Sequence, residues 1–200
     1  MKKLFLVLIL AFSTAVFAQN QMNVVQGNFD FLREQADVNV EIKFENAVFQ
    51  VENFTEEKYL EKRKTETLAK KSELAWQKWI ADWERFKSTE YNAYFLKGIN
   101  SKSKKINFKN DGNSKYTLII DSKWIYAGWH GGLIGQEAKL TSDLIFVETE
   151  NPSKVVMRLK GDQILGKPQN KDFVMEYGRI AGAYEATGKE LGKMIKKATK

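Results

Sequence analysis

The most unusual local sequence in this 200-residue chain is Trp124-Ile125-Tyr126-Ala127-Gly128-Trp129-His130-Gly131-Gly132, which includes the only histidine. Aromatic faces beside a flexible backbone can bind carbohydrate or peptide. Glycines at a strand end can equally serve only to permit positive φ angles. A lone histidine becomes a catalytic base only with a nucleophile and an orienting group beside it. We therefore predict binding residues and no catalytic residues here: Trp124, Tyr126, Trp129 and His130.

Four acidic residues in the expected strands could supply the two carboxylates of a glycosidase, which stand about 5 to 10 Å apart: Asp121, Glu137, Asp143 and Glu148. Alternating acids on the solvated face of an antiparallel sheet produce the same pattern. No nucleophile elbow and no complete phosphate-binding loop, Gly-x-x-x-x-Gly-Lys followed by Ser or Thr, accompanies them. The sequence favours a protein that is not an enzyme, and a hydrolase acting on envelope glycans or peptides is the alternative.

Lysines at 97, 102, 104, 105, 109 and 115 crowd a polar loop. We predict that Lys102, Lys104 and Lys105 contact lipid phosphates or anionic glycans, although exposed lysines also serve solubility. The chain has no cysteine and one histidine, which excludes thiolate metal sites and the commoner zinc sites. The spaced acidic pattern of a calcium loop is also missing from the sequence. We therefore predict no metal and no cofactor.

Residues 1–18 have the pattern of a secretory signal peptide: Lys2 and Lys3, an apolar run, and small residues ending at Ala18. Removing both lysines leaves 30 basic and 25 acidic residues, a net charge of +5. Without a cysteine the new N-terminus cannot carry a lipid, and no second long apolar stretch predicts an integral membrane span. We expect a periplasmic or secreted protein. Its partner would be an envelope protein or an anionic envelope glycan or lipid, and not nucleic acid.

Residues 19–36 have weak periodicity and are expected to form a loosely attached arm. Alternating apolar residues over 38–44 predict a strand, with a bulge or bend at Glu45-Asn46 before it continues. Asn53 and Glu56 predict the start of a long helix over 55–97, broken at Ser88-Thr89. Its stripe of Trp76, Trp79 and Trp83 is expected in the core, with a ligand groove or apolar carrier cavity as the other interpretation.

Three further strands are expected over 116–126, 138–149 and 154–163, and short connections make them antiparallel. A final helix over 173–197 contains glycines at 178, 182, 188 and 192, which close approach of the backbone to the sheet would offset. Arg179 is placed on the exposed side of this helix. Residues 37–200 are thus predicted to form a single two-layer α+β domain. Its antiparallel-rich sheet of four or five strands packs against the tryptophan helix and the C-terminal helix.

This order of elements, with Trp76-Gln77-Lys78-Trp79-Ile80, the run from Tyr177 to Tyr184 and Thr187-Gly188-Lys189-Glu190-Leu191, resembles uncharacterised exported proteins of Bacteroidota. In element order alone, residues 37–198 also resemble a small α+β domain. That domain occurs in the amino-terminal region of the Tol translocation protein B, in penicillin-binding-protein activator lipoproteins and in the curli secretion channel subunit. The resemblance implies a non-catalytic envelope component that binds partners or assembles.

Overall fold

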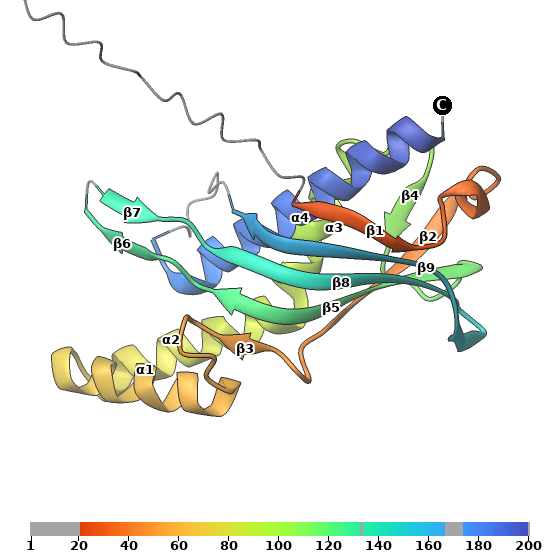
Figure 1. Cartoon of the computed structure of the whole chain (residues 1–200). Helices are drawn as coiled ribbons and strands as arrows, with labels where there is room; N and C mark the ends of the chain where they lie inside the picture. Colours follow the sequence, from red (N-terminus) through yellow and green to blue (C-terminus); the bar gives the residue numbers. More distant parts are fainter. Residues whose placement is uncertain (1–20, 133, 167–173, 200) are drawn as a thin grey trace, which may run out of the picture.

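The computed structural model describes residues 21–132, 134–166 and 174–199, so the predicted signal peptide lies outside the described residues. The α+β fold class is confirmed (Figure 1). The main sheet has seven strands, more than the four or five expected, in the order β1-β9-β8-β5-β2-β4 with β3 also on β5. Its strands are β1 (Met22–Gln26), β2 (Asp37–Lys43), β3 (Val48–Phe49), β4 (Asn107–Lys109), β5 (Tyr116–Tyr126), β8 (Lys139–Glu148) and β9 (Asn151–Leu165).

The neighbours β5, β8 and β9 pair antiparallel, as their short connections predict. β2 and β3 both pair parallel with β5, one after the other along the same edge. The chain leaves the sheet between them at residues 44–47, where the sequence predicts a bulge or bend. The strands that raise the number are short, since β1 has five residues, β4 three and β3 two, and such short runs give little recognisable alternation.

The segment before β2 is part of the fold, which corrects the expectation of a loosely attached arm. β1 pairs antiparallel with β9 at the sheet edge. A single turn of 3-10 helix, η1 (Asp30–Leu32), then inserts Leu32 into the core, where it is fully buried. A short edge strand and one helical turn bury few side chains, so their periodicity is weak.

The helices are α1 (Glu56–Lys70), α2 (Glu73–Arg85), α3 (Tyr91–Asn100) and α4 (Glu176–Ala198). α3 and α4 lie behind the sheet in the view of Figure 1, whereas α1 and α2 form a hairpin that extends past its end. The predicted long helix is therefore broken at Lys71–Ser72 instead of Ser88-Thr89. Ser72 caps α2 by accepting a hydrogen bond from the Ala75 amide at 3.2 Å, and Thr55, not Asn53, caps α1.

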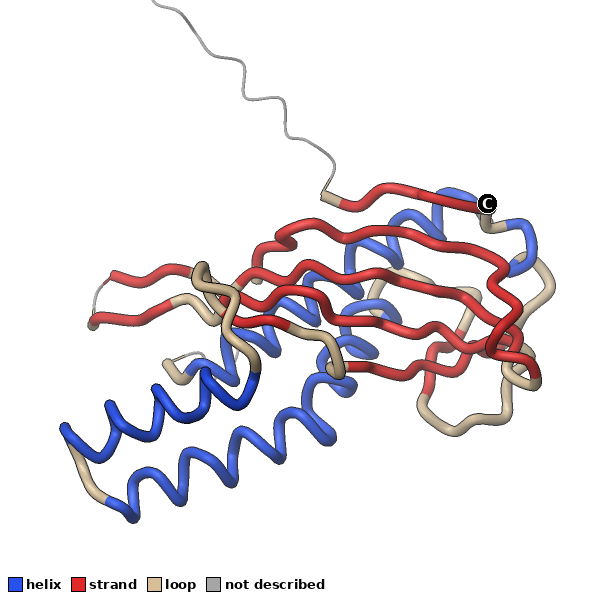
Figure 2. The backbone as a smooth tube through the Cα atoms, turned by 60° about the horizontal axis from the view of Figure 1, so that its bottom comes forward, coloured by secondary structure: helices blue, strands red, loops and turns tan. Residues whose placement is uncertain are grey.

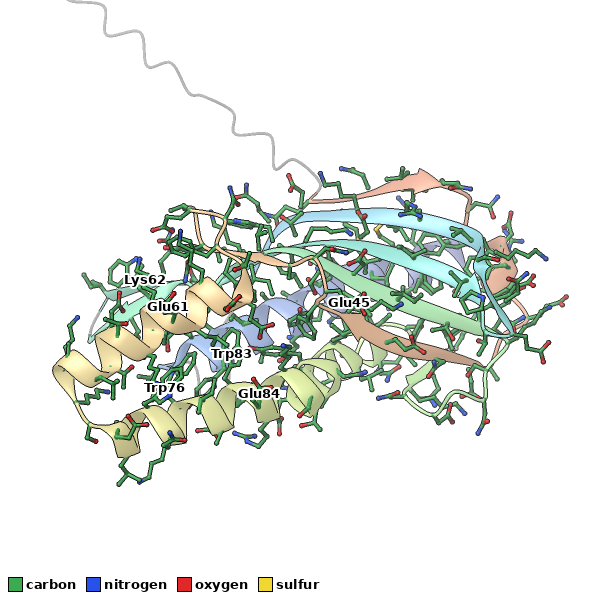
Figure 3. All side chains as sticks on the ribbon, turned by 90° about the horizontal axis from the view of Figure 1, so that it is seen from below. Glu45, Glu61, Lys62, Trp76, Trp83 and Glu84 are labelled. Carbon is green, nitrogen blue, oxygen red and sulfur yellow. The ribbon has the colours of Figure 1, made fainter. Side chains whose placement is uncertain are left out.

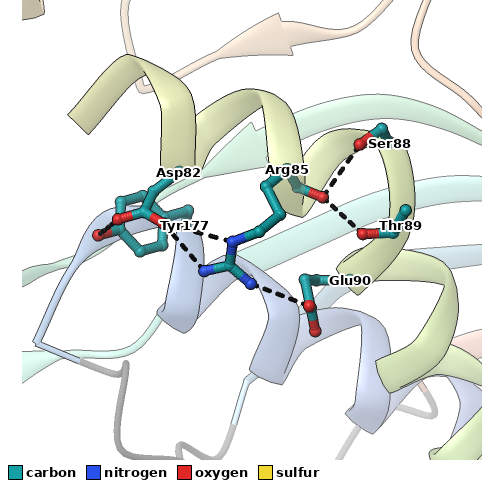
Figure 4. Close-up of polar contacts among 6 residues, drawn as sticks. All are labelled: Asp82, Arg85, Ser88, Thr89, Glu90 and Tyr177. Carbon is teal, nitrogen blue, oxygen red and sulfur yellow. Dashed lines mark hydrogen bonds and ion pairs between the residues drawn. The ribbon is translucent and has the colours of Figure 1, made fainter. Parts of the chain in front are cut away.

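Ser88 and Thr89 lie instead in a π-helical turn, η2 (Phe86–Glu90), that continues α2 into α3. Both hydroxyls donate to the Arg85 carbonyl, which satisfies a backbone acceptor where the hydrogen-bond spacing changes (Figure 4). The Arg85 guanidinium bridges Asp82 and Glu90 on either side, with N···O distances of 2.9 Å to each. The Tyr177 hydroxyl of α4 donates to Asp82 at 3.0 Å. The turn is therefore held in place.

The core lies between the sheet and α3 and α4. Its fully buried side chains include Leu118, Ile120, Phe146 and Tyr184, and the Tyr184 hydroxyl shares a 2.7 Å hydrogen bond with Ser122 of β5. Burial removes the phenolate from water and so raises the pKa of Tyr184. The prediction that the tryptophan stripe is core is confirmed, because all three rings are at most 7% exposed: Trp76, Trp79 and Trp83.

Two glycines of α4 permit close approach to α3, whereas the sequence placed the close contact at the sheet. A Cβ on Gly188 would stand 2.4 Å from the Phe95 carbonyl oxygen, and one on Gly192 would stand 2.7 Å from the Ile99 carbonyl oxygen. Backbone therefore packs on backbone along this helix pair.

The same interface buries a carboxylate. Glu185 of α4 forms ion pairs with Lys97 of α3 at 3.2 Å and with Lys189, one turn later in α4, at 2.6 Å. Burial alone would raise the pKa of Glu185, but hydrogen bonds from Lys189 and Lys97 outweigh it and lower the pKa below its usual value. Glu185 therefore stays ionised between the two helices.

Candidate binding cleft

Two hairpins project from the same end of the sheet (Figures 1 and 2). One is the helical pair α1–α2, and the other is the two-stranded sheet of β6 (Trp129–Gly131) and β7 (Ile134–Gln136). A cleft of about 250 Å³ opens here, and four segments line it: Gln50, Val51, Glu52 and Phe54 before α1; Tyr59, Lys62, Arg63 and Glu66 on α1; Tyr126 and Gly128 at the end of β5; and Glu176 on α4.

Glu176, which lines the cleft, connects α4 with α1 and α2. It accepts the Arg63 guanidinium of α1, with Nη2 to Oε1 at 3.1 Å, and the indole N–H of Trp79 of α2 at 3.2 Å. The Arg63 guanidinium also lies 5.2 Å from the centre of the Trp79 ring, a cation–π geometry. Both charged groups are about four-fifths buried, so the attraction between them has to offset the cost of removing each charge from water. The pair therefore fixes α1 against α2 and α4.

A cluster of stacked aromatic rings packs beside the cleft, and one of them, Tyr59, lines it. Trp79 stacks on Trp76 and on Trp83 with ring centres 5.6 and 5.3 Å apart, and Figure 3 shows Trp76 and Trp83 between α1 and α2. Tyr59 stacks on Phe49 at 5.1 Å. Burial, and then the negative charge of Glu176, raise the pKa of Tyr59, so its hydroxyl stays protonated. These rings pack directly against one another, an arrangement that suits a core and not a carrier cavity.

The predicted aromatic residues lie at the base of the β6–β7 hairpin and on it. The Trp124 and Tyr126 rings are parallel, 6.1 Å apart, and Tyr126 borders the cleft. Tyr126 and Trp129 both donate to the side-chain oxygen of Gln136, at 2.7 and 3.2 Å. Trp129 is 45% exposed, and His130 is partly exposed beside it. The structure thus brings these four predicted residues to one end of the molecule, although only Tyr126 lines the cleft.

Gly128 and Arg179 anchor the hairpin. Gly128 has φ +65°, and a Cβ there would lie 2.1 Å from the Gln136 carbonyl oxygen, so this glycine is required by the turn. Arg179 of α4 is buried and donates to the carbonyls of Ala127 and Gly128 at 2.9 and 3.3 Å, which corrects its predicted exposed position. Burial lowers the pKa of Arg179, but its carbonyl acceptors replace the lost water.

The predicted lysines lie elsewhere. Lys102, Lys104 and Lys105 follow α3, and Lys105 donates to the Thr199 carbonyl at the C-terminal end of α4 at 2.9 Å. Figure 1 shows this end of α4 opposite the β6–β7 hairpin. The two predicted sets of binding residues are therefore separate surfaces. The lysine loop instead adjoins Lys196 and Lys197 in the last turn of α4.

The four carboxylates considered for hydrolysis do not line the cleft. Asp121 and Asp143 are direct neighbours across β5 and β8, but Asp121 pairs with Lys123 and Asp143 lies 3.9 Å from Arg158. Glu148 pairs with Lys154 at 2.6 Å at the far end of β8. The carboxylates that do line the cleft come from segments that the sequence did not mark as sites: Glu52, Glu66 and Glu176.

Within the described ranges, no group of three or more histidine, cysteine or acidic residues could hold a metal ion. No helix in the same ranges is long and apolar enough to cross a membrane. Comparison with protein-family models, curated proteins and solved structures finds no significant match to this chain.

Proposed function

We propose that this protein is an exported, non-enzymatic cell-envelope module that binds or assembles with an envelope protein through its two-hairpin end. One observation carries the proposal. Among the described residues, eight large apolar side chains are exposed, and six of them belong to the α1–α2 hairpin, the β6–β7 hairpin or the segments beside them: Val51, Leu68, Leu74, Trp129, Ile134 and Val174. Apolar side chains gathered on one end of a protein are typical of an interaction site.

The chemistry of this end favours a protein partner with an apolar segment. Tryptophan is enriched among the residues that dominate binding energy at protein interfaces, and Trp129 is exposed at this end. The charged groups of the cleft largely pair with one another, as in Arg63 with Glu176 and Lys62 with Glu52. They can form a polar rim that excludes water around an apolar contact. Apolar area therefore supplies the attraction.

A lysine surface, formed by the lysine loop after α3 and the last turn of α4, supports a second contact, with an anionic envelope glycan or lipid. Four of its lysines have no ion pair among the described residues: Lys102, Lys104, Lys196 and Lys197. Binding through such a surface falls as salt rises, because the attraction is screened over about 10 Å at 0.1 M ionic strength. It would bring the protein to an envelope surface while the opposite end engages the protein partner.

Site-specific photo-crosslinking in cells tests the proposal. A photoreactive amino acid replaces Ile134 on β7 or, as the control, Asn151 at the start of β9, and intact mass of the purified chain reports whether residues 1–18 are removed. We expect an adduct from position 134 that weakens at least several-fold when Trp129→Ala is added, and none from position 151. Equal adducts from both positions, or none from either, would contradict it.

The alternative, a hydrolase acting on envelope glycans or peptides, has one observation in its favour, because three carboxylates line a single cleft. Glu52 and Glu176 are ion-paired, which leaves Glu66 as the acid to test. Release of soluble fragments from isolated envelope material, lost in Glu66→Gln and kept in Trp129→Ala, would support this alternative over the binding function.

A further inference from the structure

The two edges of the main sheet differ in charge, although β1, at one of them, is itself only five residues long and has an irregular register with β9 between Val24 and Gln26. At one edge β4 is three residues long, and Lys109 forms ion pairs with Asp37 at 3.3 Å and with Asp111 at 2.9 Å. Short length and charge are common devices that prevent edge strands from pairing with other chains. At the other edge β1 has the sequence Met-Asn-Val-Val-Gln, with Val24 and Val25 45% and 62% exposed. The whole stretch 19–29 carries no charged side chain.

The register of β1 shows which of its backbone groups face outward. Asp162 of β9 donates its N–H to the Gln21 carbonyl at 2.7 Å, and the pairing continues with Asn23 opposite Lys160. In an antiparallel ladder, alternate residues direct their N–H and C=O groups to the same neighbour. Gln21 and Asn23 therefore face β9, whereas Met22 and Val24 direct theirs away from β9, to the side on which no strand of the described residues pairs with β1.

We propose that β1 pairs antiparallel with β1 of a second copy of this chain, about a two-fold axis at Asn23. This register places Met22 of one copy opposite Val24 of the other, so both outward-facing residues form hydrogen-bonded pairs. It places Asn23 opposite Asn23 in a non-hydrogen-bonded pair, with Cα atoms about 4.5 Å apart. The two sheets then join into one continuous sheet, and the interface is self-complementary, as a two-fold contact requires.

The distribution of charge near β1 is compatible with pairing between two copies of the chain. Every side chain from Gln21 to Val25 is uncharged, so self-pairing brings no like charges together. The nearest charge in line with the axis is Lys160 on β9, opposite Asn23. Three strand spacings separate the two copies of Lys160, about 14 Å, and this exceeds the screening length of about 8 Å at physiological ionic strength.

Disulfide trapping tests the register directly, because the chain has no cysteine of its own. The chain starting at Gln19 carries either Asn23→Cys or, as a matched control on the same strand, Val25→Cys. About 4.5 Å between Cα atoms at the axis suits a disulfide. The two copies of residue 25 lie four residues apart along the strands, about 14 Å, which cannot be bridged. We expect rapid dimer formation from Asn23→Cys and at least tenfold slower formation from Val25→Cys.

A second change removes only the outward hydrogen bond. Val24→Pro deletes an N–H that does not face β9, whereas Val24→Thr keeps it with similar β propensity. Added to Asn23→Cys, the proline is expected to slow dimer formation about tenfold and the threonine to leave it unchanged, while circular dichroism confirms that both fold. Equal rates for Asn23→Cys and Val25→Cys, or a rate that Val24→Pro does not lower, would overturn the proposal.

The proposal rests on the proposed export in one respect, because removal of residues 1–18 leaves only two residues before Gln21 at this edge. The trapping uses a chain that already starts at Gln19, whereas intact mass of the full-length gene product in cells reports processing. A failure of self-pairing is thereby distinguished from a failure of export.

Discussion

Gly188→Ala tests whether the α3–α4 contact is as close as the structure shows. The added Cβ would lie 2.4 Å from the Phe95 carbonyl oxygen and 2.8 Å from the Ile99 amide nitrogen. Ordinary van der Waals contact begins at 3.4 Å, so the two helices must separate by about 1 Å at this point. Both contacting atoms belong to the backbone of α3, and no side-chain rotation can relieve the overlap.

Two opposing effects set the magnitude. Alanine favours a helix over glycine by about 1 kcal/mol. Overpacking a filled core costs about 1–3 kcal/mol, and a rigid backbone neighbour places this substitution at the upper end. We expect a net loss of about 2 kcal/mol in the free energy of unfolding. For a chain of this size, that lowers Tm by about 4–8 °C.

Urea unfolding followed by tryptophan fluorescence measures the effect, with thermal unfolding as a second readout. The midpoint should fall while the slope with denaturant stays unchanged, because the surface exposed on unfolding is the same. Lys193→Ala is the control, since this exposed lysine is on the same helix and its loss should change stability by no more than about 0.5 kcal/mol. A Gly188→Ala variant as stable as the parent chain would refute the close packing of the two helices.

Three further substitutions test buried polar contacts. Glu176→Gln removes the charge that holds α1 against α2 and α4, and should lower the free energy of unfolding by about 1–3 kcal/mol in urea; an unchanged midpoint would show that the ion pair contributes nothing. Tyr184→Phe leaves Ser122 without its buried partner and should cost about 1–2 kcal/mol in the same assay, whereas no loss would mean that Ser122 finds another. Glu185 has a lowered pKa, so its contribution is present above the ordinary carboxyl value of about 4.3 and is lost as pH falls through the lowered value. The stability difference between the parent chain and Glu185→Gln should therefore be largest near neutral pH and shrink in acid, and a difference independent of pH would contradict the assignment.

The parts of the fold that could be predicted have strong local periodicity. Alternation over 38–44 and the tryptophan stripe each give a repeating signal within one element. The position of the helix break was wrong because the apolar pattern continues past Lys71. Its signal was present in Ser72 followed by Glu73, a helix cap with an acid in the first turn. An unbroken helix over 55–97 would be about 65 Å long at 1.5 Å per residue, so its length indicates that a break is needed but not where the break lies.

The site could be predicted only in part, for a related reason. Tyr126 and Trp129 stand out because aromatic residues and glycines are adjacent in sequence. Arg63 and Glu176 are more than a hundred residues apart and look like the solvated charges of two amphipathic helices. Only the tertiary fold reveals that they meet. The prediction that Arg179 is exposed is wrong for the same reason, since a helical wheel cannot show that the β6–β7 hairpin covers the polar side of α4.

The first turn of α4 holds the α1–α2 hairpin and the β6–β7 hairpin in position relative to each other. Glu176 binds Arg63 on α1 and Trp79 on α2, and Arg179, one turn later, binds the carbonyls at the base of the β6–β7 hairpin. The buried charges near the cleft are thus occupied in holding the hairpins to one helix. Since leaving such a charge unpaired in a buried place costs several kcal/mol, a ligand that displaced one would have to replace its partner. The exposed apolar side chains take part in no such pairing, so under the proposed function they are the groups at this end that would contact the partner.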